Sequence, residues 1–166
     1  MKKKLKNPYL VTGLLVFVLF CILFIVKKIY PFGNNTLIYG DMHDQITAFY
    51  YHFYDVFHGN ASLFVDFTTS GGINFWGILA YYILSPVSLL LLFFPREDLY
   101  LAVSLVIAIK ILIASLTCLY SLRVLFQKKL SFWISILLAI SYAFCGYNLL
   151  MYQITPWMDA MYLFPL

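Results

Sequence analysis

The sequence predicts an all-α polytopic membrane protein, and three observations lead to this fold class. First, the 166 residues are 63% hydrophobic and only 11% charged, whereas soluble domains carry about 25% charged residues. Second, several apolar runs approach the roughly 20 residues needed to cross a bilayer as a helix. Third, the polar stretch after the first run has helical periodicity. We therefore expect about three transmembrane helices plus outer-surface juxtamembrane helices.

Charge and cysteine usage exclude several function classes. The net charge is +4, and the basic residues cluster beside apolar runs, as topology signals do, so we expect membrane lipids and no nucleic acid as partners. The three cysteines lie far apart inside apolar runs without CxxC spacing. Neither a disulfide nor a zinc site is indicated.

The first apolar run, 8–26, follows a start that contains four lysines. A cleaved signal peptide has a similar beginning, but Lys27-Lys28-Ile29-Tyr30 is not a small-residue cleavage site. We interpret the run as a retained membrane span whose N-terminus lies in the cytoplasm.

The loop 27–97 contains an expected interfacial helix near 41–58. At about 100° per residue, one stripe collects four polar residues, Asp41, Gln45, His52 and Asp55. A second stripe is apolar and contains Met42, Ile46, Phe49, Phe53, Val56 and Phe57. This pattern predicts a helix in the membrane interface with its aromatic side toward the lipid. A merely solvated polar face is the alternative.

The apolar run 75–94, interrupted at Ser85-Pro86, decides the topology. If it spans the membrane, five basic residues lie on each side. If it lies in the outer interface or dips in and returns at Pro86, seven lie inside and three outside. Because basic residues favour the cytoplasmic side, we predict three spans near 8–26, 98–122 and 131–152. The connector with Lys128-Lys129 is then cytoplasmic, and Asp159 is on the same outer face as Asp41 and Asp44.

Asp41 and Gln45 are the first candidate site residues. They are four apart, so their side chains meet on a helix face. A carboxylate beside an amide can bind a sugar hydroxyl or take its proton. Asp44 lies about 60° away on the helix and could help to hold a divalent cation. Acids that suit the dipole of a helix N-terminus are the alternative. The spacing of the three histidines makes a zinc site built from them alone improbable.

Lys110 lies in the middle of the second span. A central lysine costs roughly 2.5–3.5 kcal/mol on insertion scales, so it should face the protein interior. We expect its partner to be an acidic group beyond residue 166 or a carrier phosphate. Snorkelling is the alternative, but each helix end is about twelve residues, or nearly 18 Å, away.

Several short motifs keep one order from residue 39 onward, and together they resemble the YfhO family of bacterial multi-pass membrane proteins. They are Gly40-Asp41-Met42-His43-Asp44-Gln45 with Phe49-Tyr50, Gly59-Asn60, Gly71-Gly72-Ile73-Asn74, Tyr81-Tyr82-x-x-Ser85-Pro86, Lys110, and Trp157-Met158-Asp159 with Leu163-Phe164-Pro165-Leu166. That family is longer than 166 residues, and an apolar run begins at the end of the chain. We therefore expect residues 1–166 to be the N-terminal portion of a longer membrane domain.

The resemblance implies a GT-C type glycosyltransferase in the bacterial cytoplasmic membrane. Such a protein takes a sugar from a polyprenyl-phosphate carrier and, in this family, transfers it to a cell-envelope polymer such as lipoteichoic acid on the outer face. The resemblance makes Asp41 the candidate catalytic base, with Gln45 beside it. Asp159 becomes the second acid, for a metal or the donor phosphate.

Asp44, His52 and Lys110 are candidate substrate-binding residues, and Asp44 and Asp159 are possible ligands of a divalent cation. Two other function classes remain open at this stage. One is a transporter or flippase of lipid-linked envelope precursors, and the other is a non-catalytic membrane assembly protein.

Overall fold

The computed structural model describes residues 7–69, 71–127 and 129–166. The four lysines of the N-terminal start and Lys128, which carry much of the predicted charge asymmetry, lie outside the described residues. Among the described residues, helices dominate, and three of them are long and apolar enough to cross a membrane. The all-α membrane fold is confirmed.

The three candidate spans agree closely with the predicted ranges. The first is α1 (Pro8–Val26), which begins at Asn7, whose side chain accepts a hydrogen bond from the Tyr9 backbone. The second is α4 (Leu99–Leu125), preceded by the short turn η4 (Arg96–Asp98). The third consists of α5 (Phe132–Ala143) and α6 (Gly146–Met151), which together form one 20-residue segment.

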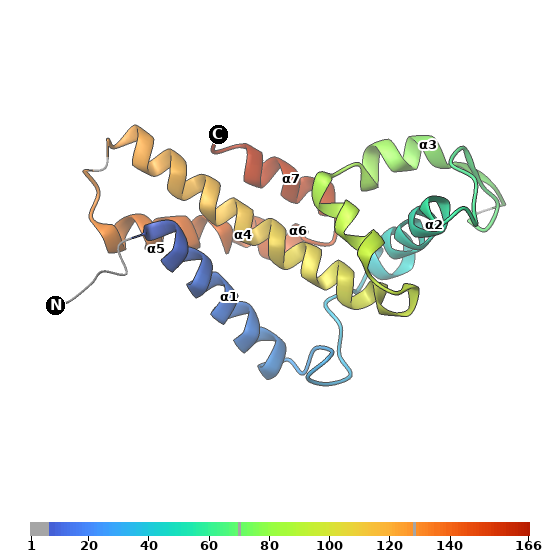
Figure 1. Ribbon diagram of the computed structural model, residues 1–166, viewed down its shortest axis with the longest axis horizontal. Coiled ribbons are helices and arrows are strands. Elements are labelled where there is room, and N and C mark those ends of the chain that lie inside the picture. Colours follow the sequence, from blue (N-terminus) through green and yellow to red (C-terminus); the bar gives the residue numbers. More distant parts are fainter. Residues whose placement is uncertain (1–6, 70, 128) are drawn as a thin grey trace.

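Helix α4 is central, because it packs against α1, α5 and α7 (Thr155–Leu163). Figure 1 shows that α1 and α4 run in opposite directions, so the long segment 27–97 begins and finishes at the same end of the bundle. We call this the loop end, and we call the opposite end, where residues 126–131 join α4 to α5, the connector end. An odd number of crossings between α1 and α4 would make these helices parallel. The arrangement therefore supports the three-span interpretation.

The run 75–94 does not form one continuous helix. It consists of α3 (Phe75–Ile78), η2 (Leu79–Ile83) and η3 (Pro86–Phe93), and its two halves are bent by 107° at the break between them. Ser85, immediately before Pro86, is extended, as the proline ring requires of its predecessor. Each half is too short to cross a bilayer by itself.

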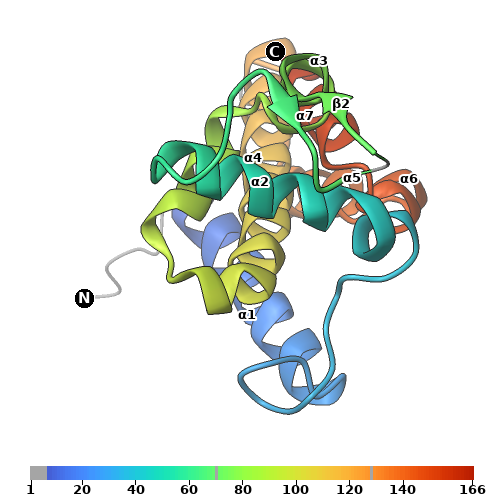
Figure 2. The same ribbon diagram turned by 90° about the vertical axis from the view of Figure 1, so that its right-hand side faces the viewer.

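The rest of the loop end is one helix and one small hairpin. The helix begins with a π-helical turn, η1 (Met42–Ile46), and continues as α2 (Thr47–Phe57). The hairpin pairs β1 (Val65–Asp66) with β2 (Ile73–Asn74) in antiparallel register. In Figure 2, α2 crosses in front of α4, so it lies over the end of the bundle.

The apolar stripe of this helix contacts protein. Met42, Ile46, Phe49 and Phe53 are between 0% and 3% exposed and belong to the same core cluster as residues of η2, η3 and α4. Our expectation that this side faces lipid is wrong for these four residues, because the segment 75–93 of the same loop packs against them. Burying each such side chain is worth about 1.5–3 kcal/mol. Phe57, at the end of the stripe, is exposed.

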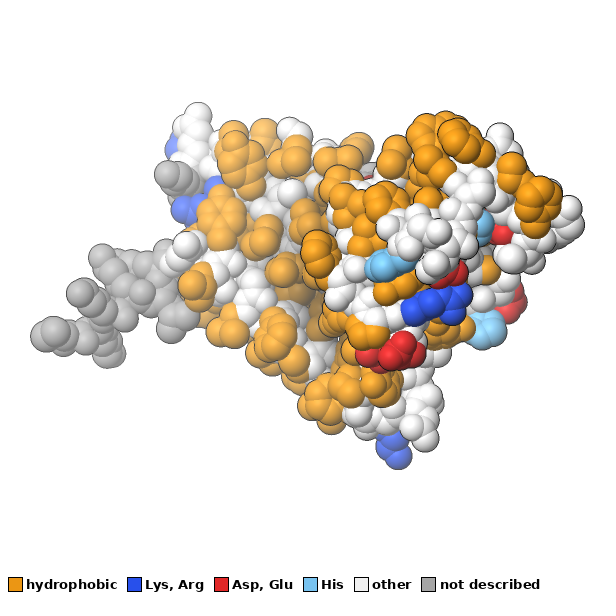
Figure 3. Space-filling model, turned by 45° about the vertical axis from the view of Figure 1, so that its right-hand side comes forward, with side chains coloured by type: hydrophobic (Ala, Val, Ile, Leu, Met, Phe, Trp, Pro, Cys, Tyr) orange, Lys and Arg blue, Asp and Glu red, His pale blue; other side chains and the backbone are white. Residues whose placement is uncertain are grey.

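The loop end differs from the rest of the surface in its charged side chains. Large hydrophobic side chains are exposed along α1, α5 and α6, as expected of helices that contact lipid. Figure 3 shows acidic and histidine side chains gathered over the loop end, among hydrophobic ones, and basic side chains at both ends of the molecule. Several aromatic side chains of the loop, such as Phe64, Phe67 and Trp76, are exposed as well. The candidate site residues must therefore be sought at the loop end.

Candidate functional site

The segment that leads into η1 is shaped by Gly40. This glycine has a left-handed φ of 54°, and a Cβ atom there would lie 2.6 Å from the Gln153 side chain. Its carbonyl accepts hydrogen bonds from the backbone of His43 and Asp44, which starts the helical turn. Asp41 at the beginning of this turn is therefore fixed in the backbone while its side chain is exposed.

Asp41 and Gln45 remain available to a ligand. Within the described ranges, neither side chain makes a hydrogen bond or an ion pair. Asp44, between them, accepts a 2.8 Å contact from Nδ1 of His43. The ring of His43 lies edge-on to Tyr100 at a centroid distance of 6.4 Å. The predicted acidic cluster is thus joined to the start of α4.

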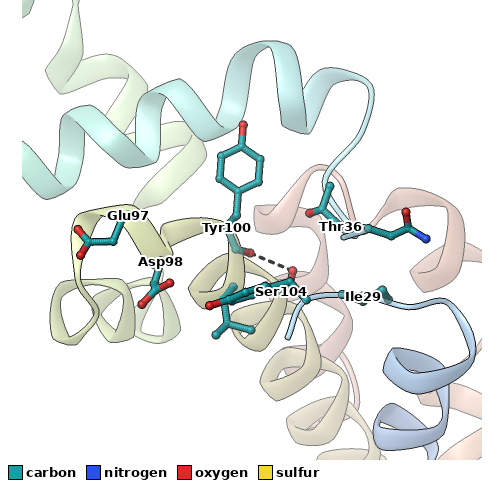
Figure 4. A pocket seen from close by; sticks show the side chains of 9 residues that line it. Ile29, Thr36, Glu97, Asp98, Tyr100 and Ser104 are labelled. Carbon is teal, nitrogen blue, oxygen red and sulfur yellow. Dashed lines mark hydrogen bonds between the residues drawn. The ribbon is translucent and has the colours of Figure 1, made fainter. Parts of the chain in front are cut away.

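Tyr100 also lines a pocket of about 330 Å³ between the start of α4 and the segment 29–36 that follows α1. Figure 4 shows Glu97 and Asp98 on one side of this pocket and Thr36 on the other, with Tyr100 pointing from α4 toward the helix above. Neither carboxylate has a hydrogen-bonding or ionic partner among the described residues. The sequence analysis did not single out Glu97, Asp98 or Tyr100. No pattern in the sequence showed that 97–100 would lie beside 29–36.

The predicted polar stripe does not continue along α2. His52 is buried, with Nε2 2.9 Å from the carbonyl of Ser62 and Nδ1 3.4 Å from Asp66. Asp55 accepts two hydrogen bonds, of 2.8 and 3.0 Å, from Arg96. The π-helical turn η1 is wider than an α-helical turn, so it shifts the angular phase between Asp41 and these residues. His52 and Asp55 consequently hold the loop together, away from Asp41.

Asp66 is the buried centre of the hairpin region. Burial raises the pKa of its carboxyl, but hydrogen bonds from the Thr68 and Thr69 hydroxyls and from the Thr68 backbone outweigh this effect, and with His52 nearby the pKa lies below its ordinary value. The carboxylate is therefore charged at neutral pH and organises the turn that follows β1.

Lys110 faces the protein interior, as predicted. Its Nζ lies 2.6 Å from Oδ1 of Asp159 and donates a 3.0 Å hydrogen bond to the carbonyl of Thr155. The expected partner was wrong, because the acid lies within the chain and is supplied by α7. The presence of Lys110 and Asp159 in apolar surroundings is a signal in the sequence for such a pair, because charges buried in a membrane usually pair with one another. The spacing along the sequence, however, did not show that α7 folds back along α4.

The ion pair belongs to a polar network that joins four elements. The hydroxyls of Tyr50 in α2 and Thr155 in α7 are 2.5 Å apart, and Ser85, at the break before η3, donates to Asp159 at 3.2 Å. Burial raises the pKa of Tyr50 to about 12, so its hydroxyl stays protonated. Tyr50, Ser85 and Thr155 were not identified as site residues from the sequence.

Asp41 and Asp159 have different surroundings in the structure. No hydrogen bond or ion pair between described residues joins Asp41 to Asp159, since Asp159 is held by Lys110 and Ser85. In the part of the chain that the structure describes, no group of three or more His, Cys, Asp or Glu side chains could hold a metal ion. We therefore derive no step through a cation at Asp44 or Asp159.

Comparison with known families agrees with this architecture. A family described as bacterial membrane protein YfhO matches residues 13–166, from the first turns of α1 to the end of α7. The chain belongs to the YfhO family. No curated protein and no solved structure matches it. Membership in the YfhO family confirms the resemblance seen in the motifs and the assignment to a membrane protein.

Proposed function

We propose that this YfhO-family chain is part of a membrane glycosyltransferase. It would transfer a sugar from a polyprenyl-phosphate carrier to a cell-envelope polymer of the lipoteichoic acid type, on the outer face of the cytoplasmic membrane. In this proposal the loop end of the bundle faces outward, and the segment Gly40 to Gln45 approaches the acceptor.

The proposal rests on the environment of the Asp41 side chain. It is an exposed carboxylate without a protein partner among the described residues, held by a fixed backbone turn next to the His43–Asp44 contact. A carboxylate so placed can take the proton of an acceptor hydroxyl while that oxygen attacks the anomeric carbon and the carrier phosphate leaves.

The buried candidates fit positioning roles better than substrate binding. His52 is engaged by Asp66 and Ser62, and Lys110 by Asp159. We assign these two residues to holding the loop and α7 in place. Asp159 remains a candidate second acid, but Lys110 and Ser85 engage its carboxylate, so it shares this positioning role.

A lipid-linked precursor transporter is the second candidate, and one observation favours it. The Lys110–Asp159 pair lies about halfway along α4, and charged pairs inside a membrane bundle often mark transport pathways. Asp41, at the loop end, has no evident role in such a transporter.

One reconstitution experiment distinguishes a glycosyltransferase from a transporter. The full-length protein is placed in liposomes with radiolabelled undecaprenyl-phosphate-glucose and a lipoteichoic acid acceptor. An enzyme moves label onto the polymer, whereas a transporter moves the labelled lipid between leaflets and leaves the polymer unlabelled. Absence of label in the polymer, under conditions in which the lipid crosses, would reject the glycosyltransferase in favour of the transporter.

A further inference from the structure

A groove of about 990 Å³ lies on the side of the bundle. Its walls are apolar and come from all three candidate spans. They include Phe20, Leu23, Ile107, Ile111, Phe144 and Leu149. A groove of this composition along membrane helices suits a hydrocarbon chain.

The mouth of the groove, at the loop end, has the opposite chemistry. It is lined by Lys27, Asn34, Asn35 and Thr36, and by no acidic side chain of the described residues. Lys27 has no ion-pair partner among the described residues. The Asn35 side chain donates a 2.7 Å hydrogen bond to the Lys27 carbonyl, which holds the loop over the end of α1. A cation with neighbouring amide and hydroxyl donors suits a phosphate group.

A second hollow adjoins this mouth. The 330 Å³ pocket of Figure 4 shares three lining residues with the groove, Ile29, Asn35 and Thr36. Its far side carries Glu97 and Asp98. These carboxylates would repel a phosphate but can accept hydrogen bonds from sugar hydroxyls. Acids that merely suit the N-terminus of α4 would not explain why the pocket opens beside the cationic mouth.

We propose that the groove and the adjoining pocket bind one lipid-linked sugar phosphate, with its chain along α1 and α4, its phosphate at Lys27 and its sugar beside Glu97 and Asp98. The identity of the chain as a polyprenyl group rests on the proposed function. The site also explains a contact described above. Tyr100 lines the sugar pocket and touches His43, so the sugar would lie next to the segment that contains Asp41.

The groove is tested by photo-crosslinking of the full-length protein in nanodiscs, with diazirine-labelled undecaprenyl phosphate as the probe. Leu149→Trp should fill the groove and reduce labelling by about tenfold, because the chain loses its apolar wall contacts. Leu150→Trp is the matched control, since Leu150 is exposed and does not line the groove. Lys27→Gln should also weaken labelling by about tenfold, and Lys28→Gln, one residue further on, should not.

The sugar pocket is tested by comparing the affinities of the protein for a lipid phosphate with and without a sugar. The wild type should bind undecaprenyl-phosphate-glucose more tightly than undecaprenyl phosphate, and Glu97→Gln with Asp98→Asn should remove that preference while leaving the affinity for undecaprenyl phosphate unchanged. Competition by phosphatidylglycerol at equal strength would show a general anionic-lipid site and overturn the assignment. Equal labelling of the Leu149→Trp and Leu150→Trp variants at the wild-type level would exclude the groove as the site of the chain.

These outcomes separate the inference from the proposed function. Binding with the predicted variant pattern but without sugar transfer would leave the lipid site standing and reject the enzyme. Sugar transfer that is insensitive to Leu149→Trp and Lys27→Gln would keep the enzyme and reject this site.

Discussion

Two groups of charged residues in this chain have opposite surroundings, and these surroundings determine what each can do. Asp41 is exposed and unpartnered among the described residues, whereas Lys110 is fully buried and paired with Asp159. A carboxylate in water can meet a substrate. A buried lysine with two protein partners is committed to structure, so mutations at the two places should affect different measurements.

Asp41→Asn should abolish sugar transfer, because removal of a general base typically lowers a rate by about 10²–10⁴-fold. The substitution is isosteric and the side chain is exposed, so expression and thermal stability should match the wild type. Transfer is measured with the labelled polyprenyl-phosphate sugar in membranes. Asp44→Asn is the matched control. Loss of transfer in Asp44→Asn with retention in Asp41→Asn would move the base to Asp44.

Asp159→Asn should destabilise the protein more than Lys110→Met does. The first change leaves a fully buried ammonium without its counter-ion, while the second leaves a carboxylate that is 18% exposed and can be partly hydrated. Breaking a buried pair costs about 3–5 kcal/mol. Thermal unfolding in detergent measures the melting temperature of each variant. The melting temperature of Lys110→Arg should be closest to that of the wild type. Equal stability of all three would contradict a buried pair.

At the scale of elements, the loop end is held by polar contacts between segments that are far apart in sequence. Arg96, before α4, clamps Asp55 of α2 and stacks its guanidinium 4.8 Å from the Tyr51 ring centroid. His52 and Asp66 tie α2 to the hairpin. The Tyr50–Thr155 contact joins α2 to α7. Helix α2 is therefore the element on which the arrangement of the loop end depends.

The hairpin region should loosen in acid because of Asp66. Its folded-state pKa lies below the ordinary value, so its contribution to stability is complete above the unfolded pKa of about 3.9 and is lost as the pH falls through the lower folded value. Protection factors of the segment 61–74, obtained from hydrogen exchange between pH 6 and pH 3 after correction for the intrinsic exchange rate at each pH, should fall as this contribution begins to be lost.

Asp66→Asn provides the control for that experiment. The variant should have lower protection factors at pH 6 and should lack the acid-dependent fall that the wild type shows. The same acid-dependent fall in both proteins would assign the effect to other carboxyl groups.

At the scale of the whole molecule, the direction of α4 decides which loops share a side of the membrane. Because α1 and α4 are antiparallel, the loop between them and the turn before α7 lie at one end, and the end of α4 and the start of α5 lie at the other. The bend of 107° before Pro86 is what allows an apolar run of 20 residues to stay at the loop end.

Cysteine labelling tests this topology in intact cells. In a background without Cys21, Cys118 and Cys145, an Asn60→Cys variant should react with an impermeant thiol reagent, since Asn60 is exposed at the loop end. A Lys129→Cys variant at the connector end should react only after the cells are broken. Labelling of Lys129→Cys in intact cells would contradict the outward-facing loop end.

The sequence alone determined the features that depend on local chemistry. Apolar length located the three spans near their observed bounds, Pro86 predicted the break in 75–94, and the cost of a central charge predicted that Lys110 faces inward. Ordered short motifs were sufficient to identify the YfhO family. Each of these follows from neighbouring residues or from transfer into lipid, which need no knowledge of long-range contacts.

The tertiary structure decided which distant segments meet. It paired Lys110 with Asp159, turned the apolar stripe of 41–57 onto the protein, and placed Glu97 and Asp98 beside the loop 29–36. The prediction of one polar stripe from α-helical periodicity also failed, because the π-helical turn η1 shifts the angular phase between Asp41 and the later residues His52 and Asp55. The physical reason is common to all these cases. A side chain's direction follows from local helical phase, but its partner is set by the folding of the whole chain, which packs apolar faces together and leaves the remaining charges to pair across the contacts so formed.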